Sequence, residues 1–298
     1  MGHDHEPANY GKAFAIGITL NLAFVILELV YGRLSNSLAL VADAGHNLSD
    51  VFGLALASGA ASLARRSPNS KHTYGFRRSS ILAALTNAVV LLIAIGAIVW
   101  EAIQRIREPQ AVEETTVIWV AAIGILINGG TALLFISGRK GDLNIRGAFV
   151  HLLADAVITL GVVVTGVAIM YSGWFLLDPI ISLVIAGIIT YGTMGLLLES
   201  IHLAMDGVPK GIDMVGIEAY LKTLPTCSDV HDLHVWGMST TEIALTAHIV
   251  LENSVCNDAL LATTANALHE KFGIEHTTLQ VEHGDPAYPC VCRLLSHS

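Results

Sequence analysis

Long apolar stretches dominate the first two thirds of the chain. A helix needs about 20 mostly apolar residues to cross a bilayer. Six segments meet that requirement, at 12–32, 38–64, 80–104, 115–137, 145–171 and 175–203. Stretches that combine charge with Gly, Pro or Ser separate most of them, such as 65–71 and 137–142. The pattern therefore predicts six membrane-spanning helices.

After Asp206 the apolar segments become shorter and alternate with polar ones. Helical spacing over 212–224 precedes two strand-like segments, a second helical segment that stops at Gly273, and a last strand; these lie at 229–238, 242–252, 257–272 and 276–282. The order α-β-β-α-β predicts a three-stranded sheet backed by two helices, close to the ferredoxin-like pattern. Because about ninety residues is small for an independent core, we expect two copies to form a two-fold homodimer.

Composition agrees with a membrane protein that carries an acidic soluble part. Hydrophobic residues make up 53% of the chain, charged residues 14%, and the mean hydropathy is +0.61. From Gly207 onward there are four Lys and Arg against eleven Asp and Glu, so this part carries −7 of the net charge of −9. An acidic surface suits cations and argues against nucleic acid as a partner. We expect an N-terminal tail at 1–11, a transmembrane domain at 12–206, an α+β domain at 207–286 and a C-terminal tail at 287–298.

Lys and Arg in the short loops predict the orientation. Five lie between the second and third spans, and Arg139, Lys140 and Arg146 lie in or at the edge of the fourth-to-fifth loop, whereas the first-to-second loop has only Arg33. Both basic loops are then cytoplasmic, and so are both termini. Arg105 and Arg107, on the other side, sit at a helix end from which long side chains can reach the interface. We expect a multi-pass membrane protein.

Two pairs of ionisable residues lie inside the predicted spans. His46 and Asp50, and likewise His151 and Asp155, are four residues apart and so share one helix face. Ionisable groups at membrane depth cost a few kcal/mol each and mark ion or proton pathways. A lone membrane histidine often only hydrogen-bonds a neighbouring helix. Two identical pairs in separate spans instead favour one tetrahedral site of two nitrogens and two oxygens, which suits zinc.

Charge counting gives such a site a mechanism. Two carboxylates and two neutral imidazoles hold a divalent cation without net charge, whereas the emptied site is left at about −2 in a low dielectric. Histidine titrates near neutral pH, so protons can replace the metal. The pattern thus favours metal export coupled to proton import by alternating access.

Other polar residues in the spans have less specific roles. We expect Asp43, three residues before His46, to support the ligands or the fold rather than to bind metal. Four more either line a water-filled cavity or join helices, and we favour the second role for them: Asn21, Glu28, Asn87 and Asn128.

In this setting three motifs resemble the cation diffusion facilitator family, closest to its zinc-transporting branch of bacterial cobalt–zinc–cadmium resistance proteins and vesicular zinc transporters. They are DAGHNLSD at 43–50, HLLAD at 151–155 and HDLHVW at 231–236. The resemblance covers nearly the whole chain. It implies a homodimeric zinc/proton antiporter of the bacterial inner membrane, not an enzyme, with the two membrane His/Asp pairs as the transport site. His46 implies a preference for Zn²⁺ over Co²⁺ or Cd²⁺.

The resemblance also implies metal ligands in the cytosolic tail domain. Carried over by position, the candidates are His231, His248, Glu282, His283 and Asp285. His234 lies three residues from His231, which puts the two on opposite faces of a strand. We therefore favour His231.

Further metal ligands are suggested for a loop and for both termini. His72 matches a loop region in which some members hold another zinc, but this loop offers a single obvious histidine, so His72 either relays metal to the tail or is solvated. A terminal Cys pair and an N-terminal His motif meet in some vesicular members. Here the equivalents are Cys290, Cys292, His3 and His5, with one residue instead of two between the cysteines.

Two other classes of function remain as alternatives. An intramembrane metalloenzyme would want HExxH or clustered histidines and an open coordination position, and the sequence contains neither motif. A metal sensor would use the acidic tail to bind metal and the membrane part as its anchor.

Overall fold

The computed structural model describes residues 11–136, 143–252 and 257–284. The chain divides into two compact units. Unit 1 comprises 1–56 and 86–197, and unit 2 comprises 57–85 and 198–298. His3, His5, Asp285, Cys290 and Cys292 lie outside the described residues.

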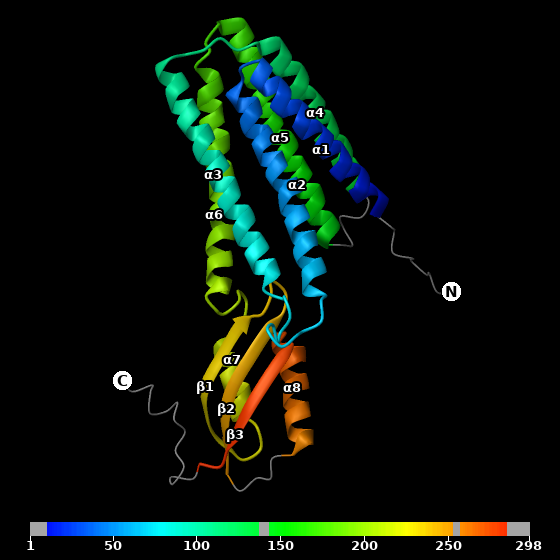
Figure 1. The fold of residues 1–298 in the computed structure, drawn as a ribbon, viewed down its shortest axis with the longest axis vertical. Coiled ribbons are helices and arrows are strands. Elements are labelled where there is room, and N and C mark those ends of the chain that lie inside the picture. Colours follow the sequence, from blue (N-terminus) through cyan, green and yellow to red (C-terminus); the bar gives the residue numbers. More distant parts are fainter. Residues whose placement is uncertain (1–10, 137–142, 253–256, 285–298) are drawn as a thin grey trace, which may run out of the picture. The chain divides into compact units, whose positions relative to one another are not determined.

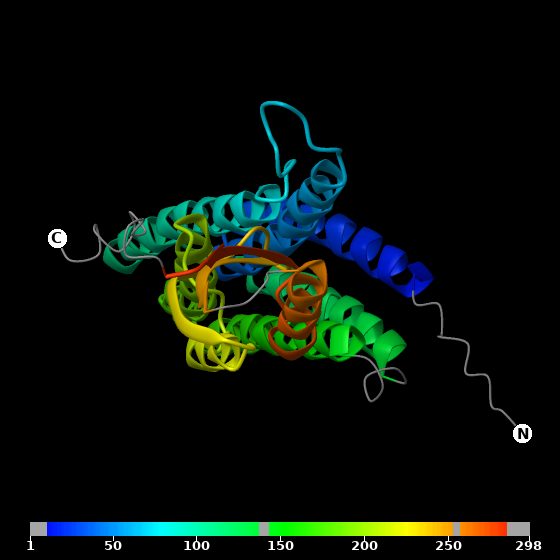
Figure 2. The ribbon, with the colours of Figure 1, turned by 90° about the horizontal axis from the view of Figure 1, so that it is seen from below.

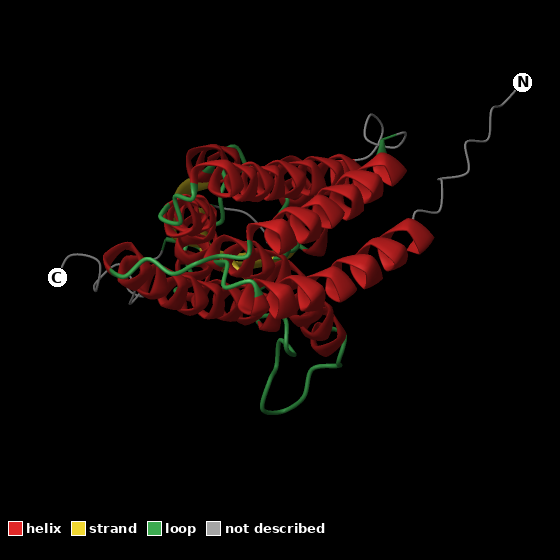
Figure 3. Ribbon diagram, turned by 90° about the horizontal axis from the view of Figure 1, so that it is seen from above, coloured by secondary structure: helices red, strands yellow, loops and turns green. Residues whose placement is uncertain are grey.

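Each predicted membrane span is a single long helix (Figure 1). These helices are α1 (Gly11–Leu34), α2 (Leu38–Ala64), α3 (Ser79–Arg107), α4 (Glu114–Phe135), α5 (Leu143–Ser172) and α6 (Leu177–Ala204). The described residues of unit 1 are helix or loop throughout, as the view in Figure 3 shows. Among the described residues four helices, α3 to α6, are long and apolar enough to cross a membrane. In α2, polar residues such as Asp43, His46 and Asp50 lower the hydropathy.

The interior of unit 1 combines apolar side chains with close helix contacts. Phe24, Leu40 and Val162 are buried in one cluster. A Cβ atom added to Gly124 of α4 would lie 2.4 Å from Cζ of Phe24 in α1 and 3.1 Å from Cγ2 of Thr159 in α5. Because glycine has no side chain, these three helices approach one another closely at this point.

A side chain from α6 holds the beginning of α2. Asp178 is buried and accepts hydrogen bonds from Oγ of Ser37 (2.6 Å), N of Leu38 (2.7 Å) and N of Ala39 (3.3 Å). The first N–H groups of a helix have no partner within the helix, and a carboxylate there also complements the helix dipole. Asp178 therefore fixes the start of the helix that carries His46 and Asp50.

Unit 2 contains the small sheet predicted for the tail (Figure 2). The element order is α7 (Met214–Lys222), β1 (Cys227–Gly237), β2 (Ile243–Leu251), α8 (Asp258–Phe272) and β3 (His276–Glu282). The strands lie in the order β1-β2-β3, with β1 and β2 antiparallel and β2 and β3 parallel. The predicted α-β-β-α-β order is confirmed.

Local capping explains where the tail helices begin and end. The predicted helix over 212–224 is shorter than expected, because Asp213 accepts a hydrogen bond from N of Gly216 and caps α7. Asn257 caps α8 in the same way through N of Leu260. Gly273 ends α8 with φ of 69°, a left-handed conformation that glycine adopts at little cost. Apolar side chains of both helices and the sheet form one core, including Leu221, Ile249 and Leu268.

Candidate metal sites

The four membrane residues predicted from the sequence meet at one point between α2 and α5. Nε2 of His46 lies 3.3 Å from Oδ1 of Asp155 and 3.9 Å from Oδ2 of Asp50. Nε2 of His151 lies 3.2 Å from Oδ2 of Asp50 and 3.6 Å from Oδ2 of Asp155. Each imidazole thus faces both carboxylates. We call these four residues the membrane quartet.

The nitrogen–oxygen separations in the membrane quartet are close to those of a tetrahedral zinc site. A tetrahedron with metal–ligand bonds of about 2.0 Å has edges of about 3.3 Å. The four nitrogen–oxygen distances run from 3.2 to 3.9 Å. Two imidazole nitrogens and two carboxylate oxygens also form a neutral site once a divalent cation is bound. His46, Asp50 and Asp155 each place one donor atom within 4.8 Å of the others, and His151 would have to move closer to supply the fourth ligand to Zn²⁺.

Exposure differs across the membrane quartet. The Asp155 side chain is 1% exposed and that of His46 is 16% exposed, whereas Asp50 and His151 are 29% and 48% exposed. Two ligands thus form a buried floor and two form an accessible edge.

Asp43 lies beside the membrane quartet and contacts Thr159, a residue of α5 one helical turn after Asp155. Oγ1 of Thr159 donates a hydrogen bond to Oδ2 of Asp43 (2.8 Å) and is 2.9 Å from the backbone oxygen of Asp155. Nearby, Nδ2 of Asn47 donates to Oε2 of Glu28 (3.1 Å). Sequence reasoning did not connect Glu28, Asn47 or Thr159 with this region, because only the packing of α1, α2 and α5 brings them together.

Three of the five tail candidates also come together. Strand pairing places His231 directly opposite His248. Glu282 offers one oxygen to each, with Oε1 2.8 Å from Nδ1 of His248 and Oε2 3.5 Å from Nε2 of His231. The two rings are 5.2 Å apart. We call these three residues the tail trio; a metal ion fits their donor atoms.

A bulge in β1 decides which histidine joins the tail trio. The pairing register shifts between His231 and His234, and Asp232 has a φ of 50°. His234 turns outward, with its side chain 64% exposed and its Nε2 3.1 Å from Oδ1 of Asp232. Oδ2 of Asp232 lies 3.6 Å from Nε2 of His248. Asp232 is therefore a neighbour of the tail trio, and the sequence analysis did not identify it. Aspartate tolerates a positive φ better than most residues, so its presence in a strand is a weak sign of such a bulge.

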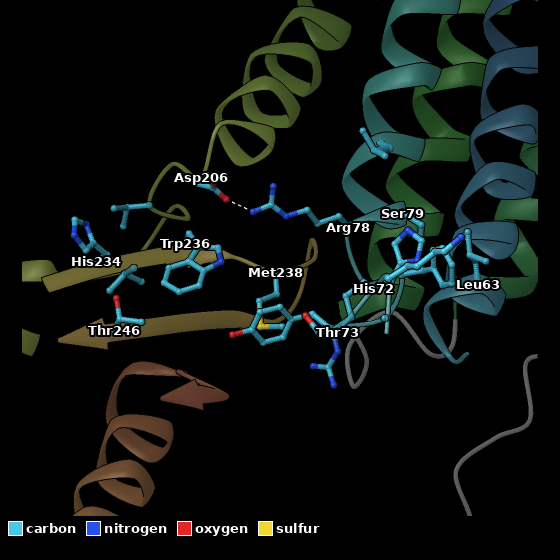
Figure 4. Close-up of a pocket in the computed structure, with 18 of the residues that line it drawn as sticks. Leu63, His72, Thr73, Arg78, Ser79, Asp206, His234, Trp236, Met238 and Thr246 are labelled. Atoms are coloured by element: carbon cyan, nitrogen blue, oxygen red, sulfur yellow. Dashed lines mark hydrogen bonds and ion pairs between the residues drawn. The ribbon is translucent and has the colours of Figure 1, made fainter. Parts of the chain in front are cut away.

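His283 and His72 lie outside these groups. His283 is exposed, with Nδ1 3.4 Å from the backbone oxygen of Leu251. The ring of His72 lies 4.4 Å from that of Phe76, and among the described residues His72 belongs to no cluster of three potential ligands. His72 and His234 line different parts of a cavity of about 980 Å³ within unit 2, where Arg78 forms an ion pair with Asp206 (Figure 4).

Cys227 has the properties of a packing residue. Burial raises the pKa of its thiol, which favours the neutral form over the thiolate that binds metal.

Comparison with known proteins gives matches over nearly the whole chain. The model of the cation efflux transmembrane domain matches residues 14–203, and that of the cation efflux protein, cytoplasmic domain, matches residues 209–284. The cadmium, cobalt and zinc/H(+)-K(+) antiporter of Bacillus subtilis (strain 168) is 33% identical over 287 residues, covering 95% of this chain and 92% of the relative. The zinc transporter ZitB of Escherichia coli (strain K12) is 34% identical over 283 residues, covering 94% and 89%.

Solved structures also include a partial match to this chain. The metal-bound C-terminal domain of the CzcD transporter from Cupriavidus metallidurans is 29% identical and covers 24% of this chain and 99% of that chain, with a TM-score of 0.23.

Proposed function

Because this chain belongs to the cation diffusion facilitator (cation efflux) family, we propose that it exports Zn²⁺ from the cytoplasm in exchange for protons, with Co²⁺ and Cd²⁺ as lesser substrates. The names of relatives support both parts of this proposal, since they include zinc transporters and a zinc/proton antiporter. The family consists of transporters, so an intramembrane metalloenzyme is set aside.

The membrane quartet carries the proposal. Its alternating nitrogens and oxygens, 3.2 to 3.9 Å apart, supply the donor number, donor type and charge that a tetrahedral zinc ion needs. We assign His46, Asp50, His151 and Asp155 as the transport site. Zinc approaches the accessible edge at Asp50 and His151 and settles against the buried Asp155.

Proton coupling follows from the charge of the membrane quartet. With zinc bound the two carboxylates are neutralised; without it they remain as two negative charges in a medium of low dielectric. Imidazoles and carboxylates that face each other at 3.2 to 3.9 Å can share protons once the metal has left. The transporter would therefore turn outward with zinc bound and return inward with protons bound.

The tail domain is proposed to join two copies and to sense cytosolic zinc. The match of 209–284 to the cytoplasmic domain of cation efflux proteins supports a cytoplasmic tail and a homodimer. With six spans, the N-terminus would lie in the cytoplasm as well. The domain limits given by the sequence, 12–206 and 207–286, are part of this proposal. Zinc bound to the tail trio would change transport only if the trio binds zinc more tightly in one conformation of the transporter than in the other. A pure metal sensor would bind zinc there without moving it across the membrane.

Transport into vesicles tests the antiport proposal. Purified protein in liposomes with an acidic lumen should accumulate zinc while protons leave, and collapsing the pH gradient should stop accumulation. Asp155→Ala should abolish uptake. Glu101→Gln is a matched control, because Glu101 is also an acidic residue in a membrane helix but pairs with Arg105 and is 44% exposed. Uptake that ignores the gradient, or that persists without Asp155, contradicts the proposal.

A further inference from the structure

Two carboxyl groups that do not belong to the membrane quartet meet inside unit 1. Glu28 of α1 and Asp43 of α2 are both 0% exposed, and their side chains lie within hydrogen-bonding range of each other. Each also accepts one hydrogen bond from a neutral group: Oε2 of Glu28 from Asn47 and Oδ2 of Asp43 from Thr159. The remaining oxygens, Oε1 and Oδ1, are buried and receive no hydrogen from other described groups.

Contact between two carboxyl groups requires a proton. Carboxylate oxygens only accept hydrogen bonds, so two of them can bond to each other only when one carries hydrogen. Among the described residues no Lys or Arg forms an ion pair with Glu28 or Asp43 that would allow both to ionise. The charged or titratable groups that act on the pair are His46 from α2 and Asp155 from α5. The Oδ1 atom of Asn47, also buried without a partner, adds an unmet polar group beside the pair.

The pair lies one helical turn from the membrane quartet. Contacts between α2 and α5 join residue 50 to 151, 46 to 155 and 43 to 159, so the two helices are antiparallel. Asp43 and Thr159 are therefore displaced from the quartet in the same direction, toward the end at which α1 is connected to α2. In the proposed orientation this is the outer side of the membrane, from which protons enter.

We propose that Glu28 and Asp43 form a proton-binding site, separate from the metal ligands, which holds one proton when the membrane quartet is empty and releases it when zinc binds. This inference rests on the proposed function. On zinc binding, the O–H bond of the pair breaks, the proton passes to water, and the charge of the pair changes from −1 to −2. The positive charge of bound zinc favours loss of the proton from the pair. When zinc leaves, the negative charge of the emptied membrane quartet favours its return. The pair thus adds one proton to each zinc exchanged.

The test counts protons released when zinc binds to the full-length protein in detergent. Calorimetry in buffers of different ionisation enthalpy gives this number for the wild type, Glu28→Gln, Glu28→Asp and the control Glu101→Gln. Glutamine resembles protonated glutamate, since its amide can donate to Asp43, but it has no proton to release. We expect Glu28→Gln to release about one proton fewer per zinc, so that the dissociation constant for zinc depends on pH about tenfold less per unit. Glu28→Asp and Glu101→Gln should resemble the wild type.

Three results would overturn the proposal. An unchanged proton count in folded Glu28→Gln places the proton elsewhere. Loss of zinc binding at an unchanged melting temperature makes Glu28 part of the metal site. A zinc affinity that responds to K⁺ in the wild type but not in Glu28→Gln identifies a monovalent cation site instead. If Glu28→Gln does not fold, Asp43→Asn, whose amide can donate to Glu28, undergoes the same measurement. Failure of the proposed function is recognised separately, because Asp155→Asn would then bind zinc as tightly as the wild type.

Discussion

Replacing Asp178 by asparagine should destabilise unit 1 and weaken zinc binding at a distance. In the wild type, Oδ2 of Asp178 accepts from N of Leu38, while Oδ1 accepts from Ser37 and Ala39. Asparagine keeps only one acceptor oxygen, so whichever way its amide turns, its NH₂ group faces a backbone N–H, that of Leu38 at 2.7 Å or that of Ala39 at 3.3 Å. Two donors then face each other in a buried position.

The size of the effect can be worked out from these contacts. A hydrogen bond to a charged group contributes about 1.5–3 kcal/mol, and a buried unsatisfied N–H costs about 1–3 kcal/mol. Removing a buried charge recovers part of this loss, so we expect a net cost of about 2–4 kcal/mol. For a unit of this size the melting temperature falls by roughly 5–15 °C. Since α2 carries His46 and Asp50, zinc affinity should also fall about tenfold, as is typical when support for a ligand is lost.

Thermal unfolding in detergent and zinc titration measure both effects. Ser37→Ala removes two hydrogen bonds, the one that Oγ donates to Asp178 and the one that Oγ accepts from N of Leu40, so it should also lower the melting temperature. Glu113→Gln is the matched control, because Glu113 precedes α4 in the N-cap position without making a side-chain cap bond, and its change should stay within about 0.5 kcal/mol. If Asp178→Asn melts within about 1 °C of the wild type, this carboxylate does not hold the start of α2.

Three further predictions concern the sites and the packing. Asp155→Asn should weaken zinc binding by about 10³-fold, which corresponds to about 4 kcal/mol for one charge near 4 Å. The loss should be smaller for Asp50→Asn, because the Asp50 side chain is 29% exposed. Equal losses in equilibrium titrations would contradict this ranking. His248→Ala should abolish the stabilisation of the tail domain by zinc, measured by melting curves. It should also reduce vesicle uptake at low zinc concentrations only. Wild-type uptake at all zinc concentrations would exclude regulation by the tail trio. Gly124→Ala should lower the free energy of unfolding by about 1–3 kcal/mol, because the new methyl group clashes with Phe24. Adding Phe24→Leu should recover part of that loss. A melting temperature of Gly124→Ala equal to that of the wild type would show that the helices can separate.

Much of the fold follows from local patterns. The six long helices are predicted within a few residues because apolar composition over about 20 residues needs no knowledge of neighbours. In the tail, Asn257 and Gly273 mark both ends of α8 through capping rules that involve only adjacent residues. The His/Asp pairs are equally local, since residues four apart share a helix face.

Contacts between elements follow different rules. Nothing in the sequence places Asp178 at the start of α2, 140 residues away from Leu38. Asp232 approaches His248 because β1 bulges between His231 and His234, whereas strict alternation along β1 would have predicted otherwise. Glu28 was assigned to joining helices, and only the packing of α1 against α2 puts its carboxyl group beside that of Asp43.

The sequence by itself therefore determined the membrane class, the order of elements and the candidate zinc ligands, because these depend on hydrophobicity and periodicity along one segment. The tertiary structure decided which candidates meet: that both membrane imidazoles face both carboxylates, that His231 rather than His234 lies beside Glu282, and that two further acids are buried near the membrane quartet. Such contacts depend on how side chains of separate helices and strands interlock, and they are set by packing over the whole unit rather than by spacing along the chain.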